Sequence, residues 1–217
     1  MNILVVGAGR LGEQAAHLLA AAGHRTTVVD QDQSRLDRLD GEHRLVHGDG
    51  CEPAVLEAAG ALRADLLIAA TGEDEDNLVI ALLAKRQFAV RRVLARTNDP
   101  DNAWLFDQRW GVDVALPAAA PLVSLIEEAA GVRDTIVLMR LAAAGVELIE
   151  TRIEETSPSA GRRLADVTLP PATVVAAVVH KGQPAVPEPG YRLHPGDTLL
   201  VVSSGAREHD IHAAFQQ

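Results

Sequence analysis

Short apolar runs alternate with segments of helical periodicity over the first 116 residues. The apolar runs, each long enough for one strand, lie at 3–6, 26–29, 44–47, 65–70, 93–96 and 113–116. The helical segments between them lie at 13–22, 34–39, 53–61, 77–87 and 100–110. After its first position the run at 65–70 carries only apolar residues, which is typical of a strand buried on both faces. The alternation predicts an α/β fold with a Rossmann-type doubly wound parallel sheet.

A strand-rich pattern replaces this alternation after a helix predicted at 121–130. Strand-like runs follow at 135–141, 147–153, 173–179 and 198–203, with helical segments at 161–166 and 206–215. The segment from 132 to 217 is long enough for a small α+β domain. We therefore expect two domains, at residues 1–131 and 132–217.

A glycine-rich turn directly follows the first apolar run. Gly7, Gly9 and Gly12 have the spacing GxGxxG, and a helical segment comes after them. Asp30 stands 18 residues after Gly12, at the end of the second apolar run. Strand, glycines, helix and acid in this order are typical of a dinucleotide-binding βαβ unit.

Each residue type in this unit has a chemical reason. Gly7 allows a tight turn, Gly9 lets backbone N–H groups approach a pyrophosphate, and Gly12 lets the helix pack closely on the strand. The helix N-terminus offers unpaired N–H donors to phosphates. Because Asp30 accepts hydrogen bonds from ribose hydroxyls and repels a 2′-phosphate, we expect NAD(H) or an adenine nucleotide rather than NADP.

Charge and cysteine content exclude several classes of protein. Among 217 residues, 30 are acidic and 20 are Lys or Arg, so that the net charge is −10 and binding to nucleic acid is not expected. The single cysteine, Cys51, excludes an intramolecular disulfide and a multi-cysteine zinc site. No basic leader precedes the first strand, and the apolar runs are too short to cross a bilayer, which predicts a cytosolic protein.

Longer motifs carry a resemblance to a known family. They are VVGAGRLG at 5–12, VVDQD at 28–32, HGDG at 47–50, DLLIAATGEDEDNL at 65–78, LART at 94–97, GVDVALP at 111–117, GRRLADVTLP at 161–170 and LHPGDTLLVVSS at 193–204. With these motifs the chain resembles the TrkA/KtrA family of RCK (regulator of K⁺ conductance) proteins, the cytosolic gating subunits of bacterial potassium uptake systems. The most specific element is TGxDExN, which begins at Thr71. The resemblance covers nearly the whole chain and implies a TrkA-N domain followed by a TrkA-C domain.

The resemblance also implies a nucleotide site that takes NAD(H) or ATP/ADP. Arg10 has an additional expected role, because in this family the arginine of GRxG can reach the nucleotide phosphate of a neighbouring subunit. The residues expected to bind nucleotide are Gly7, Gly9, Arg10, Leu11 and Gly12 around the phosphates, Asp30 and Asp32 at the ribose, Asp49, Gly50 and Cys51 at the adenine, and Thr71, Gly72 and Arg96 closing the site.

Two departures from the family pattern change the expected chemistry. The family usually has GDA followed by Ser or Thr, whereas this chain has Gly50 and Cys51, so that a hydroxyl contact to the base is lost. Many relatives carry Pro-Glu after the last strand of the first domain, where this chain has Pro117 and Ala118. Without that glutamate, we expect no cation site at this position.

The implied partners are a membrane potassium-translocating subunit of the TrkH or KtrB kind and further copies of this chain. The copies would form a dimer and, through it, a ring at the inner face of the cell membrane. In some relatives the TrkA-C domain binds cyclic di-AMP, and the corresponding segment here is 174–186, with His180 and Lys181 as possible phosphate contacts. A plain interface strand and turn is the alternative interpretation of this segment.

Two other classes of protein share a dinucleotide-binding fold. An NAD-dependent oxidoreductase needs a proton-transfer group beside the nicotinamide, and the histidines of the second half are scattered, with only His209 and His212 sharing a helical face. A redox-sensing transcription factor needs a basic helix-turn-helix, which the sequence lacks. We therefore predict a regulatory protein without catalytic residues.

Overall fold

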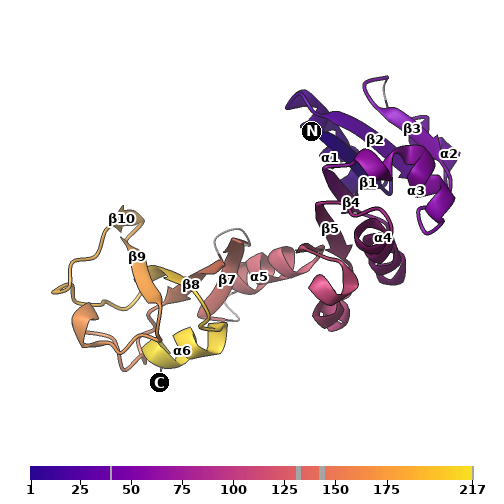
Figure 1. The fold of residues 1–217 in the computed structure, drawn as a ribbon. Helices are drawn as coiled ribbons and strands as arrows, with labels where there is room; N and C mark the ends of the chain where they lie inside the picture. The colour runs from indigo at the N-terminus through magenta and orange to yellow at the C-terminus, as the bar shows by residue number, and fades with distance from the viewer. Residues whose placement is uncertain (40, 131–132, 142–144, 217) are drawn as a thin grey trace. The chain divides into compact units, whose positions relative to one another are not determined.

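The chain folds into two compact units, Met1–Ala119 and Ala120–Gln217. The computed structural model describes residues 1–39, 41–130, 133–141 and 145–216 (Figure 1). The domain boundary expected at 131/132 falls on residues outside this described part. Helix α5 (Ala120–Ala129), expected in the first domain, belongs to the second unit because it contacts strand β7 (Thr135–Leu141).

A six-stranded parallel sheet forms the centre of the first unit. Its strand order is β3-β2-β1-β4-β5-β6, the order of a Rossmann fold, which confirms the predicted doubly wound sheet. The strands are β1 (Asn2–Val6), β2 (Arg25–Asp30), β3 (Arg44–His47), β4 (Leu66–Ala69), β5 (Arg92–Thr97) and β6 (Val114–Pro117). The α-helices are α1 (Arg10–Ala21), α2 (Gln33–Leu36), α3 (Pro53–Ala59) and α4 (Asp74–Arg86), and a 3-10 turn, η1 (Ala61–Arg63), follows α3.

Helices cover both faces of this sheet, because alternate residues of β1 enter two separate cores. Leu4 and Val6 pack with apolar residues of α3 and α4, while Ile3 and Val5 pack with residues of α1 and α2. The strand order reverses between β1 and β4, and the loops after these two strands part there. In doubly wound folds this is the point at which ligands bind.

The structure corrects the helix predicted at 100–110. Two short 3-10 helices, η2 (Pro100–Leu105) and η3 (Gln108–Trp110), replace it. The side chains of Asp99 and Asp107 each accept a hydrogen bond from the backbone N–H two residues further on, at 2.9 and 2.8 Å. Each contact begins a new turn, so that one continuous helix does not form.

The second unit contains a five-stranded antiparallel sheet of order β10-β9-β11-β8-β7. Besides β7, its strands are β8 (Val146–Arg152), β9 (Thr173–His180), β10 (Gln183–Ala185) and β11 (Thr198–Ser203). Helix α6 (Glu208–Gln216) places Ile211 and Phe215 in the core against Ile149, Leu199 and Val201 of the sheet. This small α+β arrangement confirms the predicted class of the second domain.

Two local predictions for the second unit are wrong. The segment 161–166 is helical only over η4 (Leu164–Asp166), because the N–H groups of Gly161 and Leu164 donate to carbonyls of Leu193 and Tyr191 across the loop. Strand β10 was not predicted. It pairs with β9 through a hairpin whose two turn residues, Lys181 and Gly182, both have positive φ.

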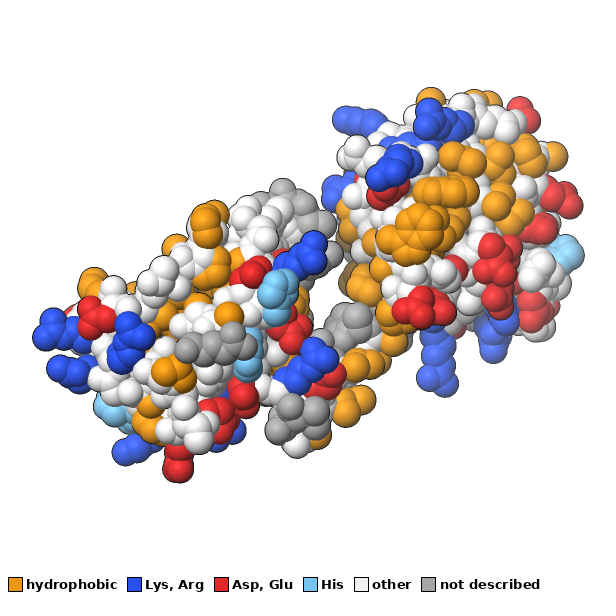
Figure 2. Space-filling model, turned by 90° about the horizontal axis from the view of Figure 1, so that it is seen from below, with side chains coloured by type: hydrophobic (Ala, Val, Ile, Leu, Met, Phe, Trp, Pro, Cys, Tyr) orange, Lys and Arg blue, Asp and Glu red, His pale blue; other side chains and the backbone are white. Residues whose placement is uncertain are grey.

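Surface charges are mixed on the face of the molecule that Figure 2 shows, where basic and acidic side chains are interspersed over both units beside groups of apolar side chains. A nucleic-acid-binding surface instead gathers Lys and Arg on one face. Within the described residues, no helix combines the length and apolar character needed to cross a membrane.

Candidate functional site

A cavity of about 340 Å³ opens at the carboxyl edge of the parallel sheet, beyond β1, β2 and β4. Its size falls within the range of roughly 300–1,000 Å³ that small-molecule sites occupy. Eight of the residues predicted from the sequence lie in its wall: Gly7, Gly9, Asp30, Asp49, Gly50, Thr71, Gly72 and Arg96. The fold therefore brings together segments that are separate in the sequence.

The three glycines of the first turn have three different environments. Gly7 has a φ of +104°, and a Cβ there would lie 2.8 Å from the carbonyl group of Ala70. A Cβ on Gly12 would lie 1.8 Å from the carbonyl oxygen of Gly7, so that helix α1 can approach the turn only without a side chain at this position. A Cβ on Gly9 would meet no atom within 4 Å, although Gly9 lines the cavity.

Helix α1 presents its N-terminus beside this cavity. Gly9 is its N-cap, and no side chain among the described residues caps the helix there. The backbone N–H groups of the first turn therefore remain available, and with the helix dipole they favour an anion. This arrangement suits a phosphate next to Gly9.

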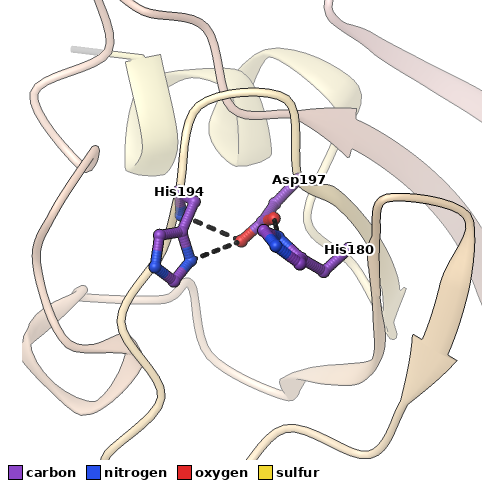
Figure 3. A group of neighbouring side chains, drawn as sticks. All are labelled: His180, His194 and Asp197. Carbon is purple, nitrogen blue, oxygen red and sulfur yellow. Dashed lines mark hydrogen bonds and ion pairs between the residues drawn. The ribbon is translucent and has the colours of Figure 1, made fainter.

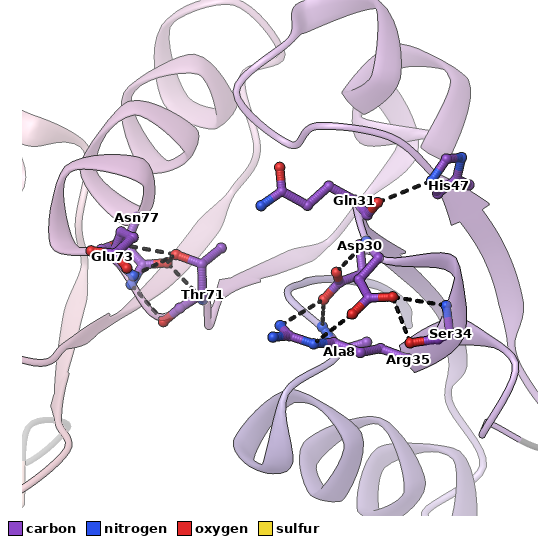
Figure 4. Close-up of polar contacts among 10 residues, drawn as sticks. Ala8, Asp30, Gln31, Ser34, Arg35, His47, Thr71, Glu73 and Asn77 are labelled. Atoms are coloured by element: carbon purple, nitrogen blue, oxygen red, sulfur yellow. Dashed lines mark hydrogen bonds and ion pairs between the residues drawn. The ribbon is translucent and has the colours of Figure 1, made fainter.

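Asp30 lies at the end of β2, and its side chain is nearly buried. Its carboxylate accepts hydrogen bonds from the N–H groups of Ala8 at 2.6 Å and Asp32 at 2.8 Å (Figure 4). The guanidinium of Arg35 lies 3.7 Å away. Because a carboxylate has about four acceptor positions, Asp30 keeps capacity for ribose hydroxyls.

Asp32 has a structural role in the same loop. Its carboxylate accepts hydrogen bonds from the hydroxyl and the N–H of Ser34, at 2.6 and 2.9 Å, and so caps α2. These hydrogen bonds, with the charge of Arg35 3.4 Å away, hold the pKa of Asp32 below its usual value. The carboxylate is therefore ionised near neutral pH and fixes Arg35 beside Asp30.

Asn77, within the TGxDExN motif, joins the loop after β4 to the end of β5. Its side-chain oxygen accepts hydrogen bonds from the N–H and the hydroxyl of Thr71, both at 2.9 Å (Figure 4). Its side-chain N–H group donates to the carbonyl oxygen of Arg96 at 2.9 Å. Asn77 is fully buried, so these contacts hold Thr71 and Arg96 in the cavity wall.

Asp74 of the same motif fixes the loop that follows β5. Its buried carboxylate accepts hydrogen bonds from the backbone N–H groups of Asn98 and Asp99, at 2.6 and 3.0 Å, and from the side chain of Asn102 at 2.9 Å. Burial raises the pKa of Asp74, but the hydrogen bonds from Asn102, Asn98 and Asp99 outweigh it, and the pKa lies below its usual value. Asp74 of the motif therefore fixes the loop after β5 without lining the cavity itself.

Arg96 is the residue in the cavity wall whose hydrogen bonding is incomplete. Its Nε atom is buried and has no hydrogen-bond partner among the described residues. Buried polar groups are nearly always paired, and guanidinium groups bind phosphate oxygens strongly. The side chain of Arg96 in the cavity wall therefore suits an anionic ligand.

Comparison with known proteins identifies the family of the chain. The TrkA-N domain model matches residues 3–117, and the TrkA-C domain model matches residues 148–216. A protein named Trk system potassium uptake protein TrkA from Mycobacterium tuberculosis is 36% identical over 214 residues, which cover 97% of this chain and 96% of the relative. The chain belongs to the TrkA family. A TrkA protein from Streptomyces coelicolor is 28% identical over 226 residues, covering 99% of this chain and 96% of the relative.

Solved structures of similar fold agree with this TrkA assignment. The Kef C-terminal domain of Shewanella denitrificans, described in its AMP-bound form, is 26% identical with a TM-score of 0.54, covering 66% of this chain and 86% of that one. A structure of GsuK bound to ADP is 26% identical with a TM-score of 0.52, covering 59% of this chain and 34% of that one. The GsuK channel bound to NAD covers 98% of this chain and 39% of that one at 18% identity and a TM-score of 0.57, which shows likeness of fold.

Five of the residues expected to bind nucleotide in a TrkA protein lie outside the cavity wall: Arg10, Leu11, Gly12, Asp32 and Cys51. Arg10 is exposed at the first turn of α1, which leaves it available to a second molecule. The N–H of Cys51 donates to Asp49 at 2.8 Å. Burial and the charges of Asp76 and Asp49 raise the pKa of its thiol to about 12, so that this thiol stays protonated.

Several wall residues were missed from the sequence: Gln31, Arg35, Gly48, Glu73, Asp76 and Ile80. Arg35 had a usable signal, because in dinucleotide-binding folds an arginine near this acid can accommodate a 2′-phosphate. Here Arg35 instead pairs with Asp30 and Asp32. Gln31, Gly48 and Glu73 lie in the loops after β2, β3 and β4, and Asp76 and Ile80 lie on helix α4.

Proposed function

We propose that this chain is the regulatory subunit of a potassium uptake system and that an adenine nucleotide in the cavity of the first unit controls a membrane potassium-translocating subunit. The observation that carries the proposal is the cavity itself. It joins Gly9, Asp30 and Arg96 in a chain that matches a Trk potassium uptake protein along nearly its full length. The relation to Trk proteins supports a location at the cytoplasmic face of the membrane.

The proposed ligands are NAD(H) or ATP/ADP. Asp30 would bind the ribose hydroxyls, while Arg96 and the N-terminus of α1 would bind phosphates. The structures of similar fold that are described with AMP, ADP and NAD support an adenine nucleotide. We further propose that Arg10 binds the phosphates of a neighbouring subunit, because it is exposed and lies outside its own cavity wall.

A binding role fits this cavity better than an NAD-dependent oxidoreductase. The titratable residues among the described lining residues are the carboxylates of Asp30, Asp49, Glu73 and Asp76 and the guanidinium groups of Arg35 and Arg96. Hydride transfer to or from a substrate hydroxyl needs a group that exchanges a proton near neutral pH, most often a histidine. His47, at the end of β3, bonds through Nε2 to the carbonyl oxygen of the lining residue Gln31 at 3.0 Å.

The second unit enters the proposal as an assembly and transmission module. Its segment 174–186 forms the β9–β10 hairpin, in which His180 is bonded to Asp197 at 2.6 Å. This bond competes with a phosphate contact from His180 and favours the interface interpretation of the segment over cyclic di-AMP binding.

Two measurements test the proposed function. Calorimetry of the full chain with ATP, ADP, AMP, NAD and NADH should give saturable binding of at least one of them. Potassium flux through the reconstituted membrane subunit should then change when that nucleotide is added together with this chain. Flux that is the same with and without the chain and its nucleotide would exclude the regulatory role.

Replacing Arg96 by alanine should weaken nucleotide binding by about 10- to 100-fold, the scale of a lost charge-assisted hydrogen bond of about 1.5–3 kcal/mol. The loss should be smaller for adenosine, which has no phosphate. Arg92→Ala is the matched control, because Arg92 is an exposed arginine on the same strand. Equal affinities of the two variants in calorimetry would show that Arg96 does not bind the phosphates.

Self-association is expected to use helix α5. Leu122, Val123, Leu125 and Ile126 are each about half exposed or more, and their spacing places Leu122, Leu125 and Ile126 on one face of the helix. We propose that a second copy of this chain covers them. Ile126→Glu should reduce the mass measured by light scattering to that of a single chain, whereas Leu18→Glu on exposed α1 should not. An unchanged mass for Ile126→Glu would remove α5 from the interface.

A further inference from the structure

Two histidines and an aspartate converge in the second unit, and none of them lines the cavity of the first unit. The ligand atoms of His180, His194 and Asp197 all lie within 4.8 Å of one another (Figure 3). Among the described residues, this is the only group of at least three His, Cys, Asp or Glu side chains whose ligand atoms lie close enough together to hold a metal ion. The proposed regulatory function does not use it.

Two elements of local structure build this cluster. His194 and Asp197 are the first and fourth residues of a turn through Pro195 and Gly196, in which the N–H of Asp197 donates to the carbonyl of His194 at 3.0 Å. Thr198 pairs with Val179 in the antiparallel β9–β11 ladder, so that Asp197 comes opposite His180 at its end. The rings of His180 and His194 are 5.0 Å apart between centroids.

The carboxylate of Asp197 is fully buried and firmly oriented. One oxygen lies 2.6 Å from Nδ1 of His180, and the other accepts hydrogen bonds from the hydroxyl of Tyr191 at 2.8 Å and the N–H of His194 at 2.9 Å. Nδ1 of His194 lies 3.6 Å from the same oxygen. The carboxylate therefore has two imidazoles as ion-pair partners within 4.0 Å. No lysine or arginine in the described part of the chain lies this close to it.

We propose that His180, His194 and Asp197 bind a divalent transition-metal ion, for which Zn²⁺ is the probe. Two imidazole nitrogens and one carboxylate oxygen form a common three-residue zinc set, with water in the fourth position. The side chains of His180 and His194 are 40% and 55% exposed, which leaves a route for the ion and its water. The hard ions Mg²⁺ and Ca²⁺ prefer oxygen ligands and should not bind here.

The geometry needs little change to accept the ion. Zinc at about 2.0–2.2 Å from its ligands holds them roughly 3.4 Å apart. The ligand atoms lie within 4.8 Å of one another, so that the widest spacing closes by at most about 1.4 Å. The 2.6 Å contact between His180 and Asp197 opens by about 0.8 Å. His194 lies in an exposed turn and can supply this movement. The ion takes the place of the hydrogen between Nδ1 of His180 and Asp197, and the neutral imidazole then carries its single ring proton on Nε2.

Tyr191 acts as a positioning residue for the proposed ion. Its hydroxyl and the N–H of His194 both donate to one oxygen of the Asp197 carboxylate. These two hydrogen bonds hold the carboxylate in place while its other oxygen binds the metal.

Calorimetric titration of the full chain with ZnCl₂, in a buffer that does not chelate zinc, tests the site. We expect one ion per chain, bound with or without adenine nucleotide. His194→Ala and His180→Ala should each lower the affinity by at least about tenfold, because losing even an outer-shell partner of a metal ligand typically costs about 10- to 100-fold. Co²⁺ should give the visible absorption of a tetrahedral complex in the parent and lose it in both variants.

Two matched controls separate this site from adventitious binding. The double variant His209→Ala/His212→Ala removes the two histidines of helix α6, and Cys51→Ala removes the single thiol. Both controls should bind zinc as the parent does. Zinc binding that survives both His180→Ala and His194→Ala, or that is lost only in a control, would overturn the proposal, as would its absence from the folded parent. The nucleotide titrations are independent of this outcome.

Discussion

A Gly9→Val variant is expected to fold as the parent does and to bind adenine nucleotide at least about 100-fold more weakly, which corresponds to about 2.8 kcal/mol. The loss of charge-assisted hydrogen bonds to a pyrophosphate is large enough to produce it. Gly9 has an extended backbone, with a φ of −70°, and an added Cβ meets no protein atom within 4 Å. The new side chain would instead stand where the phosphates approach α1. Calorimetry with the best nucleotide, together with a thermal melt, measures both expectations.

Gly12→Ala is the matched comparison, because adding a side chain to this glycine should lower the stability of the fold, whereas adding one to Gly9 should lower nucleotide affinity. Its Cβ would lie 1.8 Å from the carbonyl oxygen of Gly7, and α1 would have to move away from β1. Such overpacking typically costs about 1–3 kcal/mol of stability. If Gly9→Val binds as tightly as the parent, the pyrophosphate does not pass over Gly9. If Gly12→Ala melts with the parent, close packing of α1 is not what Gly12 provides.

The parallel sheet could be predicted because its signals are local. Each buried strand is a continuous apolar run, and the glycine turn is flanked by a strand and a helix, so that neither depends on distant contacts. The acid at Asp30 follows from the same local spacing. The residues of these segments therefore lined the cavity as expected, with Gly7, Gly9 and Asp30 in its wall.

The parts that could not be predicted depend on particular side-chain contacts and on strand register. The segment 100–110 was predicted as one helix, yet the side chains of Asp99 and Asp107 each begin a separate 3-10 turn. The site of His180, His194 and Asp197 depends on the register of β9 against β11, which the sequence does not show.

The TGxDExN motif contains residues whose role is structural. It is the most specific motif of the family resemblance, but its residues Asn77 and Asp74 are buried and do not line the cavity. Their side chains bond to the neighbouring loops of the protein. A motif can thus be characteristic of a ligand site because it fixes the loops that contact the ligand. In this chain it places Thr71 and Arg96, which line the cavity.

Asp74→Ala should therefore destabilise the first unit by about 2–4 kcal/mol, because it leaves the partly buried N–H groups of Asn98 and Asp99 and the amide of Asn102 without their acceptor. Denaturant unfolding at neutral pH measures this loss. Glu75→Ala is the matched control, since Glu75 is an exposed acid in the same first turn of α4. An equal loss in both variants would attribute the effect to the helix dipole instead of the buried hydrogen bonds.

The pH dependence of unfolding provides a second test of Asp74. Its pKa in the folded protein lies below the ordinary value of 3.8, so that its contribution to stability is present above that value and is lost as the pH falls through the folded pKa. The parent should lose stability more steeply than Asp74→Ala as the pH falls through this acid range, and the two free energies of unfolding should converge. Parallel curves would mean that the Asp74 carboxylate titrates alike in the folded and unfolded chain, and its hydrogen bonds to the loop after β5 would then not stabilise the ionised form.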